Sequence, residues 1–363
     1  MNRRRSLTVC GSVRPLRMLF DTHFVGVRKS QRKTIFSLVV GLLMRGRVGL
    51  AEIARGMCDE TTVRHRIKRG WRFLRNRGVS CEAVTVALAH WLRGSPPLIV
   101  ALDWTDLGEY MLLAAKVAVD GRAVPLAWLV LRQYLFDREK KSRNDAEEQL
   151  ILRLIQALEG RRWILLADRG FARAELFRTL LDWQVRFVIR APLNPWVRVR
   201  GFCGILGNLP RRPHHVHRYT QALYHKTQKV PVGLAVTHEE PAVEPWYLVS
   251  SPEEVDSAVS LYRKRMWIEE SFRDAKSHLG LHRFWAAKPE RVERMMILVA
   301  VVMLITILVG LGYRRRFGDR DPQLTTKRRG RSLSMFRLGR ELIWQWGIPP
   351  GLAGTSFFSG KGA

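Results

Sequence analysis

The succession of apolar segments between residues 98 and 191 constrains the fold more than any other feature of the chain. Three short runs rich in branched and aromatic residues come first, and Asp120-Gly121, a dipeptide typical of hairpin turns, joins the second to the third. These predicted strands cover residues 98–104, 110–119 and 123–131. A helix, a strand, a second helix and a fifth strand follow, near 145–158, 163–168, 172–183 and 185–191.

Strands that alternate with helices predict an α/β domain. Here a strand hairpin is followed by helix, strand, helix and strand, which is the order of a ribonuclease-H-like domain. The fold class that we expect is therefore α/β, with a ribonuclease-H-like catalytic domain whose first part covers residues 95–191.

Net charge gives the second constraint. The 363 residues include 62 Lys and Arg against 32 Asp and Glu, a formal net charge of +30. Such a chain repels itself unless a polyanion neutralises it, and basic residues spread along its whole length favour nucleic acid over a membrane surface. The four cysteines are widely spaced and form no CxxC pair, which favours neither a zinc ribbon nor a disulfide framework and agrees with a reducing cytosol.

The segments around the α/β core complete the expected organisation. Residues 1–94 are basic, with an irregular first 30 residues followed by helices, and predict an all-α N-terminal DNA-binding domain. Short strands and turns over 192–250 predict a β-rich insertion. Residues 251–313 predict the second, helical part of the catalytic domain, and residues 314–363 a basic C-terminal tail.

A helix-turn-helix is one interpretation of the N-terminal domain. Residues 49–57 and 61–76 predict a short helix, a tight break and a basic helix. The candidate DNA contacts on the second helix are Arg64, Arg66, Lys68, Arg69, Arg72 and Arg75. An ordinary helical bundle with a solvated basic face has the same pattern, and both interpretations stay open.

Residues 261–281, LYRKRMWIEESFRDAKSHLGL, hold the densest group of chemically useful side chains. Four of them are Tyr262, Arg265, Glu269 and Lys276. At about 100° per residue on one helix, these four fall within an arc of roughly 60°. The same geometry selects Glu269 over its neighbour Glu270 as the carboxylate of this face. We call the predicted helix the site helix.

Two upstream aspartates complete a set of three acids. Asp103 ends the first predicted strand and Asp168 ends the fourth. In-line phosphodiester chemistry needs an activated oxygen nucleophile and a stabilised leaving oxygen, which two Mg²⁺ ions about 3.5–4 Å apart supply. Carboxylates with retained waters suit Mg²⁺, so Asp103, Asp168 and Glu269 meet the need. Each acid alone has a structural explanation, as a strand end, an N-cap or an ion pair, and only the set indicates a site.

This set of residues resembles the DDE transposases of bacterial insertion sequences, specifically the insertion-sequence-four group. That group is marked by Tyr, two residues, Arg, three residues, Glu, six residues and Lys, and the spacing from Tyr262 to Lys276 matches it fully. Residues 103–105 match the DxT element around the first aspartate, and residues 167–171 match the ADRGF element around the second. The resemblance covers about residues 98–285.

The resemblance implies a metal-dependent, cut-and-paste DNA transposase. The acids that would hold two Mg²⁺ ions, with Mn²⁺ as a substitute, are Asp103, Asp168 and Glu269. The residues that would contact phosphates near the transposon end are Tyr262, Arg265 and Lys276. The implied partners are double-stranded DNA, as terminal inverted repeats and as target, and a second copy of the chain in a synaptic dimer. The implied location is the bacterial cytoplasm, at the nucleoid.

Relatives with a β-rich insertion cut DNA through a hairpin and stack a strand tryptophan on a flipped base. Trp246, in the segment WYLVSS, is similar to that tryptophan, although a buried strand aromatic is an equal alternative. His214, His215 and His217 include enough imidazoles for a transition metal, but their Arg- and Pro-rich surroundings favour a basic loop that faces DNA.

Two rival functions stay open. A non-catalytic DNA-binding protein derived from a transposase would share the fold, although the presence of all three acids argues against it. A membrane-associated protein is the other rival, because the apolar residues 295–312 reach the lower limit of a membrane span. A buried core helix has the same pattern, and we favour it because this is the only such segment and it lies just after the site helix. We therefore expect no membrane partner.

Overall fold

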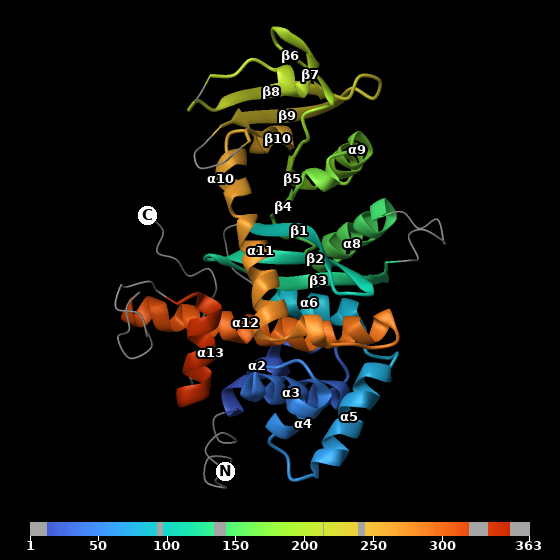
Figure 1. The fold of residues 1–363 in the computed structure, drawn as a ribbon, viewed down its shortest axis with the longest axis vertical. Coiled ribbons are helices and arrows are strands. Elements are labelled where there is room, and N and C mark those ends of the chain that lie inside the picture. Colours follow the sequence, from blue (N-terminus) through green and yellow to red (C-terminus); the bar gives the residue numbers. More distant parts are fainter. Residues whose placement is uncertain are drawn as a thin grey trace. The chain divides into compact units, whose positions relative to one another are not determined.

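The computed structural model describes residues 13–92, 97–133, 143–212, 214–238, 244–318 and 333–348. Two compact units divide the chain. Unit 1 comprises Met1–Pro96, Trp104–Glu159 and Glu269–Ala363, and unit 2 comprises Pro97–Asp103 and Gly160–Ile268. The described residues form a mixed α/β protein with a large sheet, which confirms the expected fold class at this level (Figure 1).

The sheet of unit 2 has the strand order β1-β4-β5-β10-β9-β8-β6-β7. Its strands are β1 (Leu98–Asp106, of which residues 98–103 belong to this unit), β4 (Trp163–Ala167), β5 (Arg186–Arg190), β6 (Trp196–Val199), β7 (Phe202–Ile205), β8 (His217–Tyr224), β9 (Val230–Thr237) and β10 (Trp246–Ser250). β4 is parallel to both β1 and β5, whereas β10 is antiparallel to β5 and β9. The expected short strands of 192–250 thus continue the same sheet.

Helix α9 (Ala174–Asp182) covers part of this sheet through one apolar face. Leu176, Phe177 and Leu180 are fully buried, which is the spacing of an amphipathic helix. The Phe177 ring stacks on Phe187 of β5 at 5.5 Å and meets Tyr224 of β8 edge-on at 4.9 Å. These contacts fix α9, and with it the loop that joins α9 to β4.

In unit 1 the sheet has the order β3-β2-β1, and its edge is a hairpin of β2 (Tyr110–Val119) and β3 (Arg122–Arg132). Asp120 and Gly121 form the turn with φ values of 38° and 79°, so the hairpin predicted from this dipeptide is confirmed. Helices α6 (Cys81–Trp91) and α8 (Arg143–Ala157) pack on β3. Helix α6 was not expected, although Ser80 caps it through the backbone N–H of Ala83.

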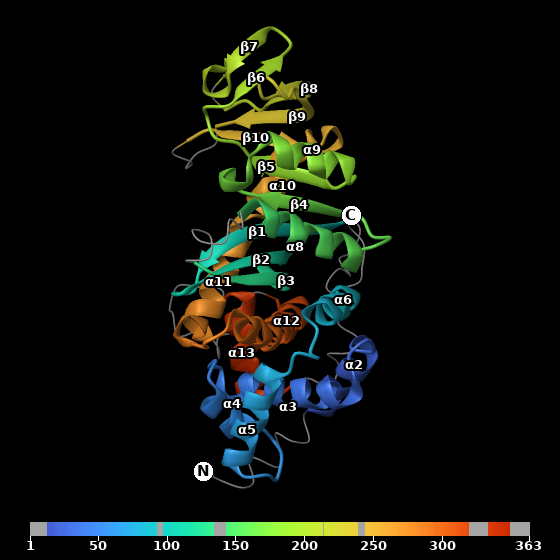
Figure 2. The same ribbon diagram turned by 90° about the vertical axis from the view of Figure 1, so that its right-hand side faces the viewer.

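The apolar helix α12 (Pro289–Phe317) is the centre of unit 1. It lies between β3 and α3 (Lys29–Arg45), as Figures 1 and 2 show. Among the described residues it is the one helix that is long and apolar enough to cross a membrane by itself, and 94% of its most apolar window is buried inside the protein. This burial agrees with the core-helix interpretation of residues 295–312.

Helices occupy much of what the structure describes at the two basic ends of the chain. At the N-terminus, α2 (Arg14–His23) lies in the segment that we expected to be irregular, and it is followed by α3, α4 (Leu50–Gly56) and α5 (Val63–Arg75). Pro15 suits the first turn of α2, and Leu16, Leu19 and Phe20 anchor that helix in the core. At the C-terminus, α13 (Met335–Trp346) lies within the expected tail. The basic cluster at 327–329 lies outside the described residues.

Two glycines allow α13 to approach α12 closely. A side chain at Gly339 would collide with the carbonyl oxygen of Thr306, and one at Gly310 would collide with that of Met335. Neither collision can be relieved by a side-chain rotation, because the obstructing atoms belong to the backbone. The helix pair therefore depends on small residues at both positions.

We predict that Gly339→Ala lowers the free energy of unfolding by about 1–3 kcal/mol, because overpacking must separate the two helices. Gly26→Ala is the matched control, since no atom lies within 4 Å of the added methyl group. Denaturant unfolding of both variants checks the prediction. Equal stability of Gly339→Ala and the wild type would contradict the close-packing account.

Candidate active site

Parallel pairing of β1 and β4 brings two acids together in unit 2. The register pairs Leu102 of β1 with Ala167 of β4, and Asp103 and Asp168 are the next residues along these two strands. Asp168 follows β4 directly, as predicted. Asp103 does not end its strand, because β1 continues to Asp106. The prediction of a strand end at Asp103 was wrong by three residues, since polar side chains in 103–106 do not interrupt the ladder.

A single cationic nitrogen joins the two acids. The Arg265 Nη2 atom lies 3.2 Å from Asp103 Oδ2 and 3.6 Å from Asp168 Oδ2. The side chains of Arg265 and Asp103 are only 11% and 15% exposed, so water screens these charges weakly. Two neighbouring carboxylates repel each other at such a site, and the guanidinium offsets that repulsion. Sequence spacing had assigned Arg265 to the site but not to this position between the aspartates.

The other carboxylate oxygen of Asp168 caps a short helix. Asp168 Oδ1 accepts a hydrogen bond of 2.9 Å from the backbone N–H of Gly170 and caps the short helix η1 (Arg169–Phe171). The N-cap explanation of this residue is therefore confirmed, and its role in a site stays a prediction. Because the cap holds the carboxylate, Oδ2 keeps its direction toward Arg265.

Tyr262 and Trp246 form an aromatic pair in the same unit. Their ring centroids are 5.2 Å apart at an interplanar angle of 73°. Tyr262 lies in α10 (Ala258–Arg263) with only 5% of its surface exposed, and burial raises the pKa of its hydroxyl to about 12. Trp246 is the first residue of β10 and is half-buried. The tyrosine is therefore a neutral hydrogen-bond donor at physiological pH.

The predicted site helix is not one regular helix. Helix α10 ends at Arg263, α11 (Met266–Arg273) begins after a two-residue turn, and a π-helical turn follows (Asp274–His278). In the turn, Arg265 N–H donates to the Tyr262 carbonyl and Ile268 N–H to that of Arg265, both three residues back. The uniform spacing of 100° per residue that grouped the four signature residues was therefore wrong, because tight and wide turns replace it locally.

Glu269 and Lys276 belong to unit 1. Glu269 lies in the first turn of α11, four residues after Arg265 in the sequence. Lys276 lies in the π turn and is half-buried, and burial lowers the pKa of its amine while the nearby Asp106 carboxylate opposes that shift. Asp106 of β1 is thus close enough to Lys276 to act electrostatically on its charge.

Trp104, which follows Asp103 in β1, anchors that strand in unit 1. Its indole N–H donates a hydrogen bond of 2.9 Å to Glu147 of α8, and the Arg143 guanidinium lies 5.9 Å from the ring centre. The large residue at this position therefore has a packing partner, which could not be predicted from its local sequence.

Two cations that the sequence did not single out lie against α11 and the turn after it, and one of them pairs with a third such residue, Asp274. Arg122 Nε is 3.0 Å from Asp274 Oδ2, and Lys116 is 1% exposed in the middle of β2. All ten residues of β2 are buried, so a lysine within an otherwise apolar strand was the available signal for this cluster.

The histidine segment gives no metal centre. The rings of His215 and His217 are 5.0 Å apart at 75°, and His217 Nε2 accepts a hydrogen bond from the Arg212 N–H. Within the described ranges, no group of three or more His, Cys, Asp or Glu side chains is arranged to hold a metal ion.

The sequence model of the transposase DDE domain matches residues 95–305, more than half of the chain. The chain belongs to the DDE transposase family. The match includes the two converging aspartates, Arg265 and the whole signature segment. A search of curated proteins gives no significant match. Membership identifies this transposase as a DNA-acting enzyme of the nuclease type, in agreement with its net charge of +30.

We predict that Asp274 makes folding stability fall as pH rises from about 4 to 6. Burial raises the pKa of its carboxyl to about 6, against the opposing effects of Arg122 and Lys116 and with support from Glu270. The folded transposase then keeps a proton that the unfolded chain has released, so stability is greatest below the unfolded pKa and is lost on passing the folded pKa. The loss amounts to about 3 kcal/mol.

Denaturant unfolding of the wild type and of Asp274→Asn over this pH range measures the effect. His278, 3.8 Å from the Asp274 carboxylate, also titrates with a lowered pKa, but it is present in both proteins and cancels in the difference. Parallel stability curves for the two proteins would contradict the prediction.

Proposed function

We propose that the chain is a Mg²⁺-dependent, cut-and-paste transposase of the insertion-sequence-four group. The observation that carries the proposal is the convergence of Asp103 and Asp168 on Arg265, in a chain whose Tyr-Arg-Glu-Lys spacing continues from that arginine. The proposed third acid is Glu269. A ribonuclease-H-like arrangement is part of the proposal, and the strand order β3-β2-β1-β4-β5 with β4 parallel to both its neighbours supports it.

The donor set suits magnesium. Mg²⁺ prefers carboxylate oxygens, retains several waters and is commonly held by one or two protein carboxylates. Asp103 and Asp168 point oxygens at the same cationic nitrogen, so their site already stabilises positive charge. We propose that these two aspartates and Glu269 hold two Mg²⁺ ions, for which Mn²⁺ can substitute. When bound, such ions activate a water nucleophile and stabilise the leaving oxygen.

The proposed reaction has two steps. Water attacks the phosphorus at the transposon end, the bond to the 3′ oxygen breaks, and a free 3′ hydroxyl is released. That hydroxyl then attacks a phosphodiester of target DNA, forms a new bond to phosphorus and displaces a target 3′ oxygen. The protein acids orient these oxygens in line, and the water-poor surroundings of Asp103 strengthen each electrostatic contact.

The proposed DNA-contacting residues are Tyr262, Arg265, Lys276 and Trp246. A phenol, a guanidinium and an amine suit phosphate oxygens, and a half-buried indole beside Tyr262 suits stacking on an extruded base in a hairpin route. Stacking would require Trp246 to leave its edge-on contact with Tyr262. We propose further that two copies act in a synaptic dimer, at the nucleoid of a bacterial cytoplasm.

The basic helix α5 is the proposed DNA contact of the N-terminal helices. Arg66 and Arg69 both pair with Asp59, at 2.9 and 2.6 Å, so these two arginines tie α5 to the preceding loop. The cations that remain on the exposed side of the helix are Arg64, Lys68, Arg72 and Arg75. The six cations of residues 64–75 therefore divide into two arginines that pair with Asp59 and four residues that face solvent.

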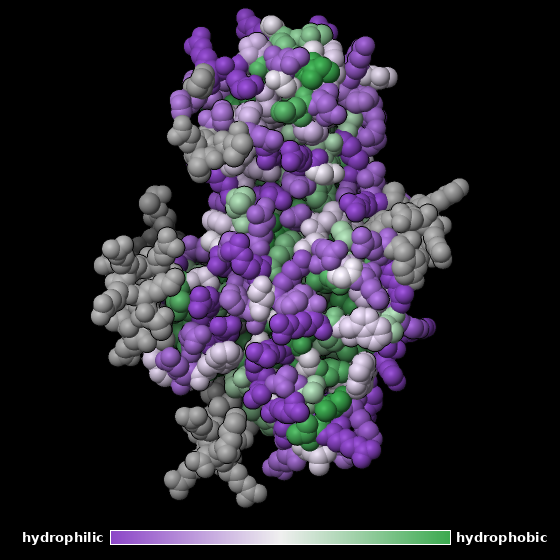
Figure 3. Space-filling view, in the orientation of Figure 1, coloured by the Kyte–Doolittle hydropathy of each residue, from purple (hydrophilic) through white to green (hydrophobic). Residues whose placement is uncertain are grey.

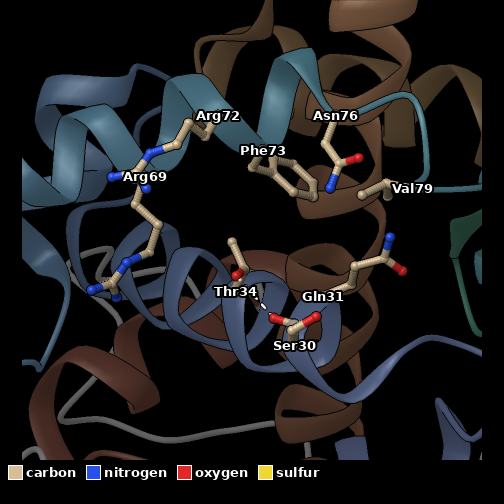
Figure 4. A pocket seen from close by; sticks show the side chains of 8 residues that line it. All are labelled: Ser30, Gln31, Thr34, Arg69, Arg72, Phe73, Asn76 and Val79. Atoms are coloured by element: carbon tan, nitrogen blue, oxygen red, sulfur yellow. Dashed lines mark hydrogen bonds between the residues drawn. The ribbon is translucent and has the colours of Figure 1, made fainter.

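A cleft of about 180 Å³ beside α5 supports this assignment. Ser30, Gln31 and Thr34 of α3 line one side, and Arg69, Arg72, Phe73, Asn76 and Val79 line the other (Figure 4). Arg72, beside hydroxyl and amide groups in this cleft, suits a backbone phosphate. Figure 3 shows that hydrophilic residues are spread over the face it draws, with apolar residues between them.

We predict that Asp103→Asn, Asp168→Asn and Glu269→Gln each lower Mg²⁺-dependent cleavage on the order of 10⁴-fold, because each removes a proposed metal ligand. Binding to a duplex that carries the inverted repeat flanking the gene should change less than about threefold. Gel assays of binding and cleavage on the same duplex measure both quantities.

Asp182→Asn serves as the control, because Asp182 is an exposed carboxylate at the end of α9. It should cleave like the wild type. Full cleavage by any of the three acid variants would refute the assignment of that acid, and a wild type that binds but never cleaves would favour the non-catalytic derivative.

We predict that Arg72→Gln combined with Arg75→Gln weakens binding to specific and random duplexes alike. Each lost phosphate contact should reduce the slope of log affinity against log salt concentration by about 1. Fluorescence anisotropy in a salt series measures the slope. Arg66→Gln, in the same helix, should instead lower folding stability by about 2 kcal/mol and leave the slope unchanged. The α5 assignment fails if the three substitutions affect the slope equally.

A further inference from the structure

The part of α11 that follows Glu269 packs on β2 in unit 1 through buried contacts of Lys116, Ser271 and Phe272, which we call the clamp. Ser271 Oγ donates a hydrogen bond of 2.5 Å to the carbonyl of Ala123, and Lys116 Nζ donates one of 3.2 Å to Ser271 Oγ. The same Lys116 nitrogen lies 3.3 Å from the ring centre of Phe272. Lysine, serine and phenylalanine thus form one contact set between β2 and α11.

The hairpin has an irregularity in its strand pairing beside Lys116. The β2–β3 register shifts at Ala115 and Lys116, so that Leu126 is an extra residue on β3 beside Pro125. Proline has no N–H to donate to the ladder, and a bulge with its stronger twist accommodates it. On β2 the side chains at positions 114 and 118 share a face with Lys116 by strand alternation, and both are alanines, so the face leaves room for a close helix.

A second pair of contacts fixes the next turn of the helix. Arg122 at the start of β3 is 3.0 Å from Asp274 and 3.5 Å from Glu270. The Asp274 side chain is 3% exposed, so the pair is protected from water and from salt. Glu270 and Asp274 are therefore both held by the start of β3.

The central hydrogen bond of the clamp lies on the side of α11 away from Glu269. At about 100° per residue within α11, Ser271 lies about 160° from Glu269 around the helix axis, and Phe272 lies about 60° from it. Lys116 therefore contacts α11 at its back through Ser271 and nearer to Glu269 through Phe272. Carboxylate oxygens lie about 6 Å from the axis, so a rotation of about 20° would move them by about 2 Å. Displacements of that size are costly at a metal or catalytic centre.

We propose that Lys116 is a positioning residue of the transposase, which sets the rotation of α11 and thereby the direction in which the Glu269 carboxylate points. The inference rests on the proposed function, because it takes Glu269 as the third metal ligand. A merely structural lysine would stabilise the fold without affecting metal affinity. Burying a charged group costs free energy, and Lys116 is only 1% exposed within an apolar strand. It contacts α11 through Ser271 and Phe272.

Manganese binding to the full chain tests the proposal without DNA. Free Mn²⁺ is quantified by electron paramagnetic resonance for the wild type, Glu269→Gln, Lys116→Met and the double variant. Methionine keeps the length of the side chain and removes its charge. We expect Lys116→Met to weaken Mn²⁺ binding about 10-fold, the lower end of losses seen when a residue that orients a metal ligand is changed. The double variant should bind no more weakly than Glu269→Gln alone, because both changes remove the same ligand.

Arg294→Met is the matched control. Arg294 is another buried cation of unit 1, 8% exposed, and its Nη1 atom donates a hydrogen bond of 2.8 Å to the Leu74 carbonyl. Its loss should lower stability while Mn²⁺ affinity stays within about twofold. If Lys116→Met does not fold by circular dichroism, Ser271→Ala provides the second variant, with an expected loss of about threefold from removal of the central hydroxyl.

The outcomes distinguish the proposal that Glu269 is a metal ligand from the proposal that Lys116 positions it. Unchanged Mn²⁺ affinity in Glu269→Gln would overturn the metal assignment and the positioning role with it. A loss in Glu269→Gln without any loss in Lys116→Met or Ser271→Ala would overturn the positioning role alone. Losses that multiply in the double variant would also overturn it, because Lys116 would then act independently of Glu269.

Discussion

The parallel register of β1 and β4 is the constraint on which the candidate site depends. Because Leu102 pairs with Ala167, the next residue of each strand is an aspartate, and a single guanidinium nitrogen lies within ion-pair distance of both. A shift of one residue in either strand would turn one carboxylate to the opposite side of the sheet. Arg265 reduces the repulsion between the acids, and the cap on Gly170 holds Asp168, so the pair is oriented by the fold itself.

Much of this arrangement could be predicted from the sequence. Apolar runs with turn residues between them located β1 to β5, and Asp120-Gly121 located the hairpin, because buried strands and positive-φ turns have local signals. The position of the two aspartates beside neighbouring strands could be predicted because each directly adjoins such a run. Helix α6 was missed, since its mixture of alanine, valine and threonine has little periodicity and its existence depends on packing against β3 and α8.

The conformation of the signature segment could not be predicted from its own residues alone. Spacing alone grouped Tyr262, Arg265, Glu269 and Lys276 on an ideal helix, but the backbone tightens before α11 and widens after it. These departures accompany long-range contacts, such as Arg122 with Asp274 and Lys116 with Ser271, whose partners are some 150 residues apart in the sequence. Likewise, Arg66 and Arg69 belong to a basic helix that was predicted to contact DNA, and their pairing with Asp59 was not predicted. Ion pairs between segments have no periodic signal.

The central claim is that Asp103, Asp168 and Glu269 share divalent ions. The most direct measurement is a crystal structure of the full chain with Mn²⁺ and a duplex of its own inverted repeat, in which anomalous scattering locates the metal. The account predicts manganese peaks within bonding distance of carboxylate oxygens from all three residues, with Arg265 moved away from the aspartates toward a phosphate. Manganese bound without Glu269, or a guanidinium that still joins the two aspartates in the DNA complex, would contradict it.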